Sequence, residues 1–519
     1  MVRAAKWRGA NVFAFIARRL GVLFVILFGS SFILYNLAAI SGDPLDELRV
    51  SNDPRAAQQI INLTRQLDLD TPPPLRYFKW LSKVVQLDFG KTREAQQVSE
   101  ALMAAIPTTI RLVIAATVIA IILGIALGIV SALRQYSRFD YAMTFVAFLL
   151  FSLPVFWVAV LLKQYLAISF NDLLMDPELS KKGMLAMAAA SGVFWSAVIS
   201  GTRKRVIQVF AIAFVLTGAL LYFISSTLWL ADPYLGPIAT FAISVGIAFA
   251  VTQLSVGIQH KPSLYSALTM AGIGLVMYFP AQTIFEWENR RFLWPALILV
   301  TVIVAVVTAL LFAKIDRGPV IRTSVITALL VIFTILVDKM LRTMGPYMAT
   351  DAVNYRPIPT FGQENSLLEK GNFWFTFFDT AVHLVLPTFA LLLISFAGYI
   401  RFSRGTLLEV LNQDYIRTAR AKGLPERTVI MRHAFRNTLI PLTTIIVVDF
   451  AGIIGGAIIT EKVFGWRGMG TLFNMAISSF DLNLLMGVFF ITSTMAVLAN
   501  LVADLLYSAL DPRIRVGGN

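Results

Sequence analysis

The longest apolar runs in this chain are each long enough to cross a lipid bilayer as a helix. Examples are residues 20–40, 112–133, 141–162, 292–313 and 482–510. A transmembrane helix needs about 17–25 mostly apolar residues. Hydrophobic residues make up 57% of the 519 positions and charged residues only 14%, which is too little polar surface for a soluble chain of this length. The sequence therefore predicts an all-α fold, a polytopic bundle of transmembrane helices.

Hydropathy predicts about twelve spans in this bundle. The shortest of them covers residues 184–200. The expected spans cover residues 20–40, 110–133, 141–170, 184–200, 206–230, 235–258, 264–285, 292–313, 323–341, 381–400, 438–460 and 482–510.

Basic residues between the runs predict the orientation of the bundle. With the N-terminus inside, the cytoplasmic segments hold 24 Lys and Arg against 6 Asp and Glu, whereas the opposite segments hold 15 and 19. Positive charge is typical of the cytoplasmic side, so both termini are expected in the cytoplasm. The run at 20–40 is too long for a signal-peptide core and no small-residue cleavage site follows it promptly, so we expect a retained first helix. The cytoplasmic segments are 1–19, 134–140, 201–205, 259–263, 314–322, 401–437 and 511–519.

The first external loop, residues 41–109, is too long to be a simple connection. It contains three consecutive prolines, at positions 72–74, and the aromatic residues Tyr77, Phe78 and Trp80. Such aromatic side chains are enriched at the membrane–water boundary. We therefore expect a small ordered element of short helices on the external side.

Several classes of function are disfavoured by composition and motif content. The net charge of +14 is distributed between the apolar runs instead of forming one basic face, so no nucleic-acid partner is expected. Cysteine is absent, and His260, His383 and His433 lie in separate segments, so no metal site is expected. No phosphate-binding Gly-Lys-Ser/Thr loop occurs, so the chain is not expected to be an ATPase or to bind a cofactor itself. No Ser/His/Asp set or carboxylate pair shares a neighbourhood, so no catalytic residue is expected.

The cytoplasmic loop at 401–437 carries the most specific pattern. It is helix-forming up to Lys422, is interrupted at Gly423 and Pro425, and is then amphipathic and basic up to Arg436. An ordinary helix end would also explain Gly423, because glycine tolerates the left-handed conformation in either case. A helix, a glycine corner and a second helix would form a knob on the cytoplasmic face. A knob of this kind suits docking to a soluble partner.

The sequence of this loop resembles that of the dipeptide/oligopeptide/nickel permease family of binding-protein-dependent ABC importers. The resemblance is carried by the segment from Tyr415 to Gly423, by His433 and by Asn437. Relative to the broader importer motif, Arg417 and Thr418 replace a Glu and an Ala, and Arg436 stands where Pro is common.

Further motifs agree with the first of the family's two permease subunits. They are Arg18-Arg19-Leu20, Gly42-Asp43-Pro44, Leu87-Asp88-Phe89-Gly90, Pro107-Thr108-Thr109, Gly455-Gly456-Ala457, Glu461, Val463-Phe464, Gly468, Gly470 and the C-terminal stretch from Asn500 to Arg515. Arg467 departs from the proline that is usual before the Gly-x-Gly.

The resemblance implies a transport subunit located in the cytoplasmic membrane of a prokaryote. It implies four kinds of partner: a second homologous permease subunit, two cytoplasmic ATPase subunits or domains that bind ATP and Mg, an extracytoplasmic solute-binding protein, and the lipid bilayer. It also implies that the cytoplasmic loop couples to the ATPase. The expected coupling residues are Asp414, Tyr415, Arg417, Thr418, Ala419, Arg420, Ala421, Lys422, Gly423, Leu424, Arg427, Arg432, His433 and Arg436.

One large departure separates this chain from the family. Family members have about six helices, whereas residues 171–356 carry six additional candidate spans. An even number of spans returns the chain to the same side, so the coupling loop stays cytoplasmic. We therefore expect three parts: an N-terminal half of the permease core (1–170), an inserted membrane domain (171–356) and a C-terminal half of the core (357–519).

Asp449 is a candidate for the solute path because it lies inside the run at 438–460. A charge within the membrane is costly and marks a functional candidate. A polar helix interface or a partner subunit would explain it equally well. At the level of the whole chain, the alternative is a twelve-helix secondary transporter driven by an ion gradient, which has no use for a helix-glycine-helix loop.

Overall fold

The computed structural model describes residues 9–177, 179–199, 201–286, 290–313, 317–369 and 371–510. Within these ranges the chain is helical and contains no strand. Ten helical segments there are long and apolar enough to cross a membrane. The expected all-α bundle is therefore confirmed. The expected runs at 184–200 and 438–460 correspond to α9 (Lys181–Val198) and α18 (Phe435–Gly456), which are helical but are not among the ten.

The core of the bundle is formed by α5 (Val98–Leu133) packed along α15 (Phe373–Leu411). Two glycines one turn apart permit this approach. A Cβ on Gly124 would lie 2.5 Å from Cβ of Tyr399, and a Cβ on Gly128 would lie 1.9 Å from Oγ of Ser403. Close packing of small residues is the usual means of association between helices in lipid. The helices α1 (Gly9–Ser41), α18 and α21 (Leu482–Leu510) complete this part of the bundle.

The expected span at 141–170 is not one straight helix. It consists of α6 (Arg138–Ser152), α7 (Val155–Leu162), the π-helical turn η1 (Lys163–Ile168) and α8 (Ser169–Met175). Pro154 has φ −63° and ψ 137°, an extended conformation that ends α6 and starts α7. Proline has no N–H and cannot continue the preceding helix. The apolar composition continues through this break, which is why hydropathy did not reveal it.

In the described part of the expected insert, six long helices follow α8 and form two groups. One group is the pair α9 and α10 (Arg203–Ser226), which pack on each other, and α9 also contacts α6. The other group consists of α11 (Gly236–Ser255), α12 (Lys261–Ile284), α13 (Arg290–Phe312) and α14 (Arg317–Met348). In the second group α14 packs against α11, α12 and α13, and it also contacts α15 of the core.

Short helices occupy the expected first external loop, as the sequence predicts. They are α2 (Asp46–Arg49), α3 (Ala56–Gln66) and α4 (Pro73–Val84). The loop is shorter than expected, because residues 98–109 form the first turns of α5 and Pro107 is accommodated inside that helix. The same change moves the start of the second span from residue 110 to Val98.

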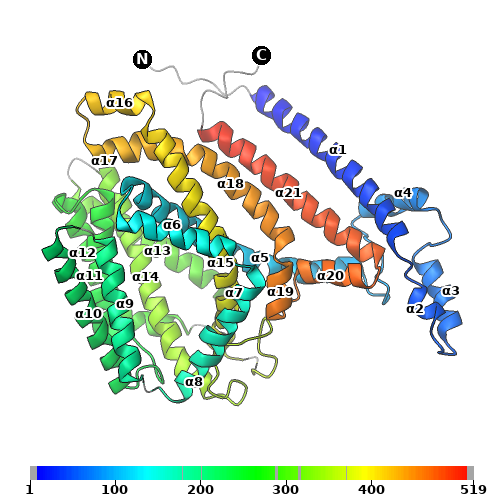
Figure 1. The fold of residues 1–519 in the computed structure, drawn as a ribbon, viewed down its shortest axis with the longest axis horizontal. Coiled ribbons are helices and arrows are strands. Elements are labelled where there is room, and N and C mark those ends of the chain that lie inside the picture. The colour runs from blue at the N-terminus through cyan, green and yellow to red at the C-terminus, as the bar shows by residue number, and fades with distance from the viewer. Residues whose placement is uncertain are drawn as a thin grey trace.

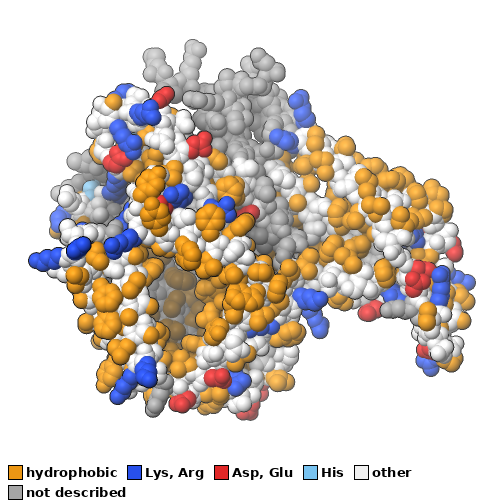
Figure 2. Space-filling model, in the orientation of Figure 1, with side chains coloured by type: hydrophobic (Ala, Val, Ile, Leu, Met, Phe, Trp, Pro, Cys, Tyr) orange, Lys and Arg blue, Asp and Glu red, His pale blue; other side chains and the backbone are white. Residues whose placement is uncertain are grey.

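The core has two long connections, the first external loop and the segment that follows α15, and they lie at opposite ends of the bundle (Figure 1). Figure 1 shows α16 (Asp414–Ala421), the first residues of α1 and the last turns of α21 at one end, and α2, α3 and α8 toward the other. In Figure 2, hydrophobic side chains cover the flank between these ends, and basic side chains gather around α16. This distribution is the one expected of a chain whose flank faces lipid.

Candidate functional sites: the coupling segment and the outer cluster

The segment that follows α15 forms the expected helix and glycine corner. The helix α15 continues to Leu411, so residues 401–411 belong to it and the coupling segment proper covers residues 412–434. It contains α16, α17 (Glu426–Thr428) and the π-helical turn η2 (Val429–Ala434), which leads directly into α18. The second helix of the expected knob is therefore a short helical stretch continuous with α18. We call residues 412–434 the coupling segment below.

Gly423 makes the corner. Its φ is +72°, the left-handed region that glycine adopts without a steric penalty. Its N–H donates to the carbonyl of Arg420 at 2.9 Å, and the N–H of Leu424 reaches the carbonyl of Ala419 at 3.4 Å. Pro425 then starts α17 with φ −56°. The backbone at this position is thus one that a residue with a side chain adopts only with strain.

A small apolar cluster anchors the coupling segment on the core. Ile416 and Ala419, three residues apart on α16, are buried together with residues from the last turns of α5 and α15 and from η2. Ala419 was expected to be a coupling residue, and the structure gives it a packing position. The cluster consists of Ala132, Leu407, Ile416, Ala419, Val429 and Ala434.

Most of the other expected coupling residues share an exposed surface. This surface runs from α16 over the corner to the first turns of the next helical stretch, and His433 is half-buried beside it. Its members are Asp414, Tyr415, Arg417, Thr418, Arg420, Ala421, Lys422, Gly423, Leu424, Arg427, Arg432 and Arg436.

An ion pair closes the corner from outside. The guanidinium of Arg420 donates to both carboxylate oxygens of Glu426, with Nη2–Oε1 2.7 Å and Nε–Oε2 3.2 Å. Arg420 lowers the pKa of the Glu426 carboxyl and has its own pKa raised by the same hydrogen bond. The two side chains lie on opposite sides of Gly423, so their pairing favours the bent form of the segment.

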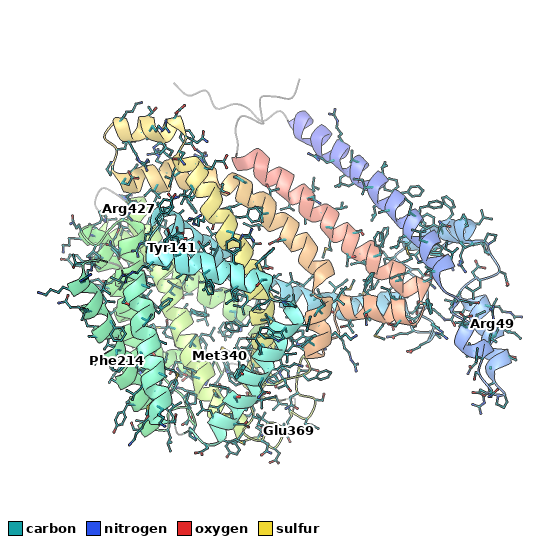
Figure 3. The ribbon with its side chains drawn as sticks, viewed as in Figure 1. Arg49, Tyr141, Phe214, Met340, Glu369 and Arg427 are labelled. Atoms are coloured by element: carbon teal, nitrogen blue, oxygen red, sulfur yellow. The ribbon has the colours of Figure 1, made fainter. Side chains whose placement is uncertain are left out.

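Arg427 lies at the edge of this surface, and its guanidinium contacts the inserted helices. Its Nη2 donates to the carbonyl oxygens of Leu254 at 2.7 Å and Gln253 at 3.3 Å, both in the last turn of α11. Figure 3 labels Arg427 at the place where α17 meets this group of helices. The contact joins positions 173 and 174 residues apart, and nothing in the sequence pattern indicated it.

A second polar cluster, which we call the outer cluster, joins α5, α19 (Ile458–Phe464) and α20 (Met469–Ser478). Oγ1 of Thr109 donates to Oε1 of Glu461 at 2.8 Å and accepts from the N–H of Met469 at 2.8 Å. The other carboxylate oxygen of Glu461 accepts from the N–H of Thr471 at 2.8 Å. A Cβ on Gly468 would lie 2.3 Å from Oε1 of Glu461, so only glycine fits there. Thr109, Glu461 and Gly468, which belong to separate sequence motifs, thus lie in contact with one another.

A pocket of about 580 Å³ lies next to the outer cluster. It is lined by the segment after α14, the first turns of α15 and the turn between α19 and α20. The elements that line it lie at the end of the bundle away from the coupling segment (Figure 1). Thr108 connects the two sites, because its Oγ1 lies 3.3 Å from Oε1 of Gln363 in the pocket wall. Polar and charged residues in the lining include Arg356, Gln363, Glu364, Asn365, His383 and Arg467.

Asp449 lies on α18 and is half-buried. Its carboxyl is within electrostatic reach of the hydroxyl of Tyr399 on α15. Tyr399 is fully buried, and its hydroxyl completes no hydrogen bond among the described residues. Asp449 therefore occupies an interface between two core helices, and its place in a solute path stays a prediction.

The helical bundle defines a multi-pass membrane protein. Residues 124–516 match the family described as "Binding-protein-dependent transport system inner membrane component". The chain belongs to this family.

Curated relatives carry names from peptide transport. The chain is 42% identical over 146 residues to the oligopeptide transport system permease protein OppB of Mycobacterium tuberculosis (strain ATCC 25618 / H37Rv), which is 28% of this chain and 45% of the relative. It is 42% identical over 163 residues to the oligopeptide transport system permease protein AppB of Bacillus subtilis (strain 168), covering 31% and 50%. It is 42% identical over 147 residues to the dipeptide transport system permease protein DppB of Escherichia coli (strain K12), covering 28% and 42%. The chain thus spans about half the length of the curated relatives it matches.

Proposed function

We propose that this chain is a permease subunit of an ATP-driven importer for di- or oligopeptides or similar small solutes. The observation that carries the proposal is the coupling segment, a bent and basic projection with an apolar anchor and an exposed tip. Family membership and the names of the relatives support a transport function. A twelve-helix secondary transporter would not need such a projection.

The coupling segment transmits the state of the ATPase to the bundle. Two cytoplasmic ATPase subunits or domains, which bind ATP and Mg, dock on the exposed surface around Gly423. Their closure on ATP displaces the segment, and its anchor on α5 and α15 passes the displacement to the two helices that form the centre of the bundle. ATP thereby biases an equilibrium between two access states by binding one state more tightly.

The remaining partners follow from the architecture of a binding-protein-dependent importer. A second, homologous permease subunit completes the translocation path. An extracytoplasmic solute-binding protein delivers the solute to the external face, which includes α2, α3 and α4 and the pocket beside the outer cluster. Both termini lie in the cytoplasm, and Asp449 lines the path in the membrane.

The experiment that tests this proposal uses the assembled complex reconstituted in liposomes. Gly423→Pro forces φ to about −65° at a position where it is +72°, and it should abolish the stimulation of ATP hydrolysis by the loaded binding protein. Gly423→Asn is the matched control, because asparagine tolerates the left-handed region and should retain most of the stimulation. Co-purification of the ATPase subunits with each variant shows that the complex is assembled. Full stimulation in an assembled Gly423→Pro complex would refute the assigned role of the segment.

A further inference from the structure

Three of the inserted helices, α9, α11 and α12, accept hydrogen bonds from other parts of the chain at their C-terminal carbonyl groups. The last carbonyls of a helix have no partner within the helix and carry partial negative charge, so cationic donors bind them well. Arg427 of the coupling segment reaches the end of α11 in this way. Arg134, between α5 and α6, donates to the carbonyl of Val198, the last residue of α9. Trp374 of α15 donates from Nε1 to the carbonyl of Phe285 after α12 at 3.0 Å.

Only the α11 contact includes the coupling segment. The turn after α11 lies beside this segment, because a Cβ on Gly257 would be in ordinary van der Waals contact with Nη1 of Arg427, at 3.4 Å. Gly257 has φ +91°, so this turn has the conformation that glycine permits. The inserted helices therefore reach the segment on which ATP acts.

The two attachments of the coupling segment differ in kind. Its attachment to the core is the buried apolar cluster around Ile416, and separating it would expose that cluster to water. Its attachment to the inserted helices is a pair of hydrogen bonds from an exposed guanidinium. Exposed polar contacts contribute little and exchange readily with water. A displacement of the segment therefore moves it with the core and breaks the contact at α11.

We propose that the inserted helices act as a latch on the coupling segment. The hydrogen bonds from Arg427 to the end of α11 form this latch. In the closed latch the segment is held in the position described here, which disfavours its ATP-driven displacement. Release of the latch accompanies each transport cycle. This inference rests on the proposed function and assigns a regulatory role to the part of the chain that the family resemblance leaves unexplained.

The first arm of the test opens the latch. In the reconstituted complex, Arg427→Ala should raise ATP hydrolysis without binding protein about two- to fivefold, the range for losing one exposed polar contact. Lys261→Ala removes a positive charge from the same end of the inserted helices, at the start of α12, and should leave hydrolysis unchanged. Hydrolysis by Arg427→Ala at or below the wild-type rate overturns the latch.

The second arm closes the latch covalently and exploits the absence of cysteine in the chain. The pair Leu254→Cys and Arg427→Cys, joined by a short reducible cross-linker, should stop ATP-driven uptake of a labelled dipeptide, and reduction should restore it. Each single variant, Leu254→Cys or Arg427→Cys, treated with the same reagent is the control and should keep its uptake. Uptake that persists in the cross-linked 254–427 complex, or that is lost equally in the treated single variants, overturns the proposal.

Failure of the proposed function looks different from failure of the latch. A wild-type complex that shows no stimulation of ATP hydrolysis by loaded binding protein contradicts the function itself. A wild-type complex that is stimulated, together with variants and cross-linked forms that behave like it, contradicts only the latch.

Discussion

Asp140 and Arg404 form a bidentate ion pair that joins the start of α6 to the C-terminal part of α15. The distances are 2.7 Å for Nε–Oδ1 and 2.9 Å for Nη2–Oδ2. Ser131, near the end of α5, donates its hydroxyl to Oδ1 of Asp140 at 2.5 Å. The Asp140 side chain is only 3% exposed. Because α15 leads directly into the coupling segment, this pair holds in place the helix end from which that segment begins.

Substitution of Asp140 by Asn should destabilise the bundle in a pH-dependent manner. Hydrogen bonds to Arg404 lower the pKa of Asp140 from 3.8 to about 2. A carboxyl whose pKa is lower in the folded state stabilises it above the unfolded pKa, and the contribution is lost as pH falls toward the folded pKa. We expect Asp140→Asn to lower the free energy of unfolding by about 1.5–3 kcal/mol at neutral pH, and the difference from wild type to shrink between about pH 4 and pH 2. Thermal unfolding in detergent across this range measures it.

The control for that experiment is Asp172→Asn. Asp172 pairs with Arg356 at 3.4 Å, and both side chains are more than half exposed, so its loss should leave the unfolding temperature nearly unchanged. A difference between wild type and Asp140→Asn that stays constant down to pH 2 would contradict the role of the ion pair.

The Arg420–Glu426 pair should influence coupling more than stability. Glu426→Lys places two positive charges across the glycine corner, which favours opening of the bend. We expect this variant to lower the stimulation of ATP hydrolysis by loaded binding protein about twofold or more, with the unfolding temperature unchanged, because the pair is exposed. The exchanged pair Arg420→Glu with Glu426→Lys restores opposite charges and should recover most of the stimulation. Equal loss in the single and the exchanged variants would show that the individual side chains, and not their pairing, matter to the ATPase.

Local patterns in the sequence were sufficient to predict the helical bundle and the bent coupling segment. Gly423 and Pro425 lie two residues apart within a helix-forming stretch, so the corner is visible in one stretch of chain. Two of the prolines in the core, Pro107 and Pro154, show where local patterns are no longer sufficient. Pro107 is absorbed into α5, whereas Pro154 divides α6 from α7. The outcome depends on how neighbouring helices satisfy the freed backbone groups, and the sequence does not reveal those neighbours.

The polar pairs that position the sites were beyond sequence analysis for a related reason. Thr109 and Glu461 are 352 residues apart, and Asp140 and Arg404 are 264 residues apart. Each residue alone looks like an ordinary polar group at the edge of an apolar run. The resemblance to the permease family did name Thr109 and Glu461, but only the structure shows that they contact each other.

Gly468 should tolerate no side chain, because Glu461 and Thr109 occupy the space. A Cβ there would lie 2.3 Å from Oε1 of Glu461 and 2.4 Å from Oγ1 of Thr109. We expect Gly468→Val to lower the free energy of unfolding by about 1–3 kcal/mol through displacement of these hydrogen-bonded groups. The unfolding temperature of the purified protein in detergent measures the loss.

Gly398→Ala is the matched control: Gly398 lies inside α15 with open space around it, so the extra methyl should be neutral or slightly stabilising. Equal unfolding temperatures for the two variants would refute the close packing of the outer cluster.

Asp449 offers a direct test of the solute path. If its carboxylate meets the amino group of a passing peptide, Asp449→Asn removes a charge-assisted hydrogen bond. The ATP-driven uptake of a dipeptide with a free amino group should then fall roughly ten- to a hundredfold, whereas uptake of the N-acetylated dipeptide relative to wild type should be unaffected.

Tyr399→Phe is the companion variant, because it removes the hydroxyl that faces Asp449 and keeps the carboxylate. It should alter both uptake rates equally. A variant Asp449→Asn that is less stable in detergent but keeps the wild-type ratio between the two peptides would place the carboxylate in the α15–α18 interface instead. The ratio of the two uptake rates is therefore the decisive quantity, since a general loss of folding or of ATP coupling lowers both rates and leaves their ratio unchanged.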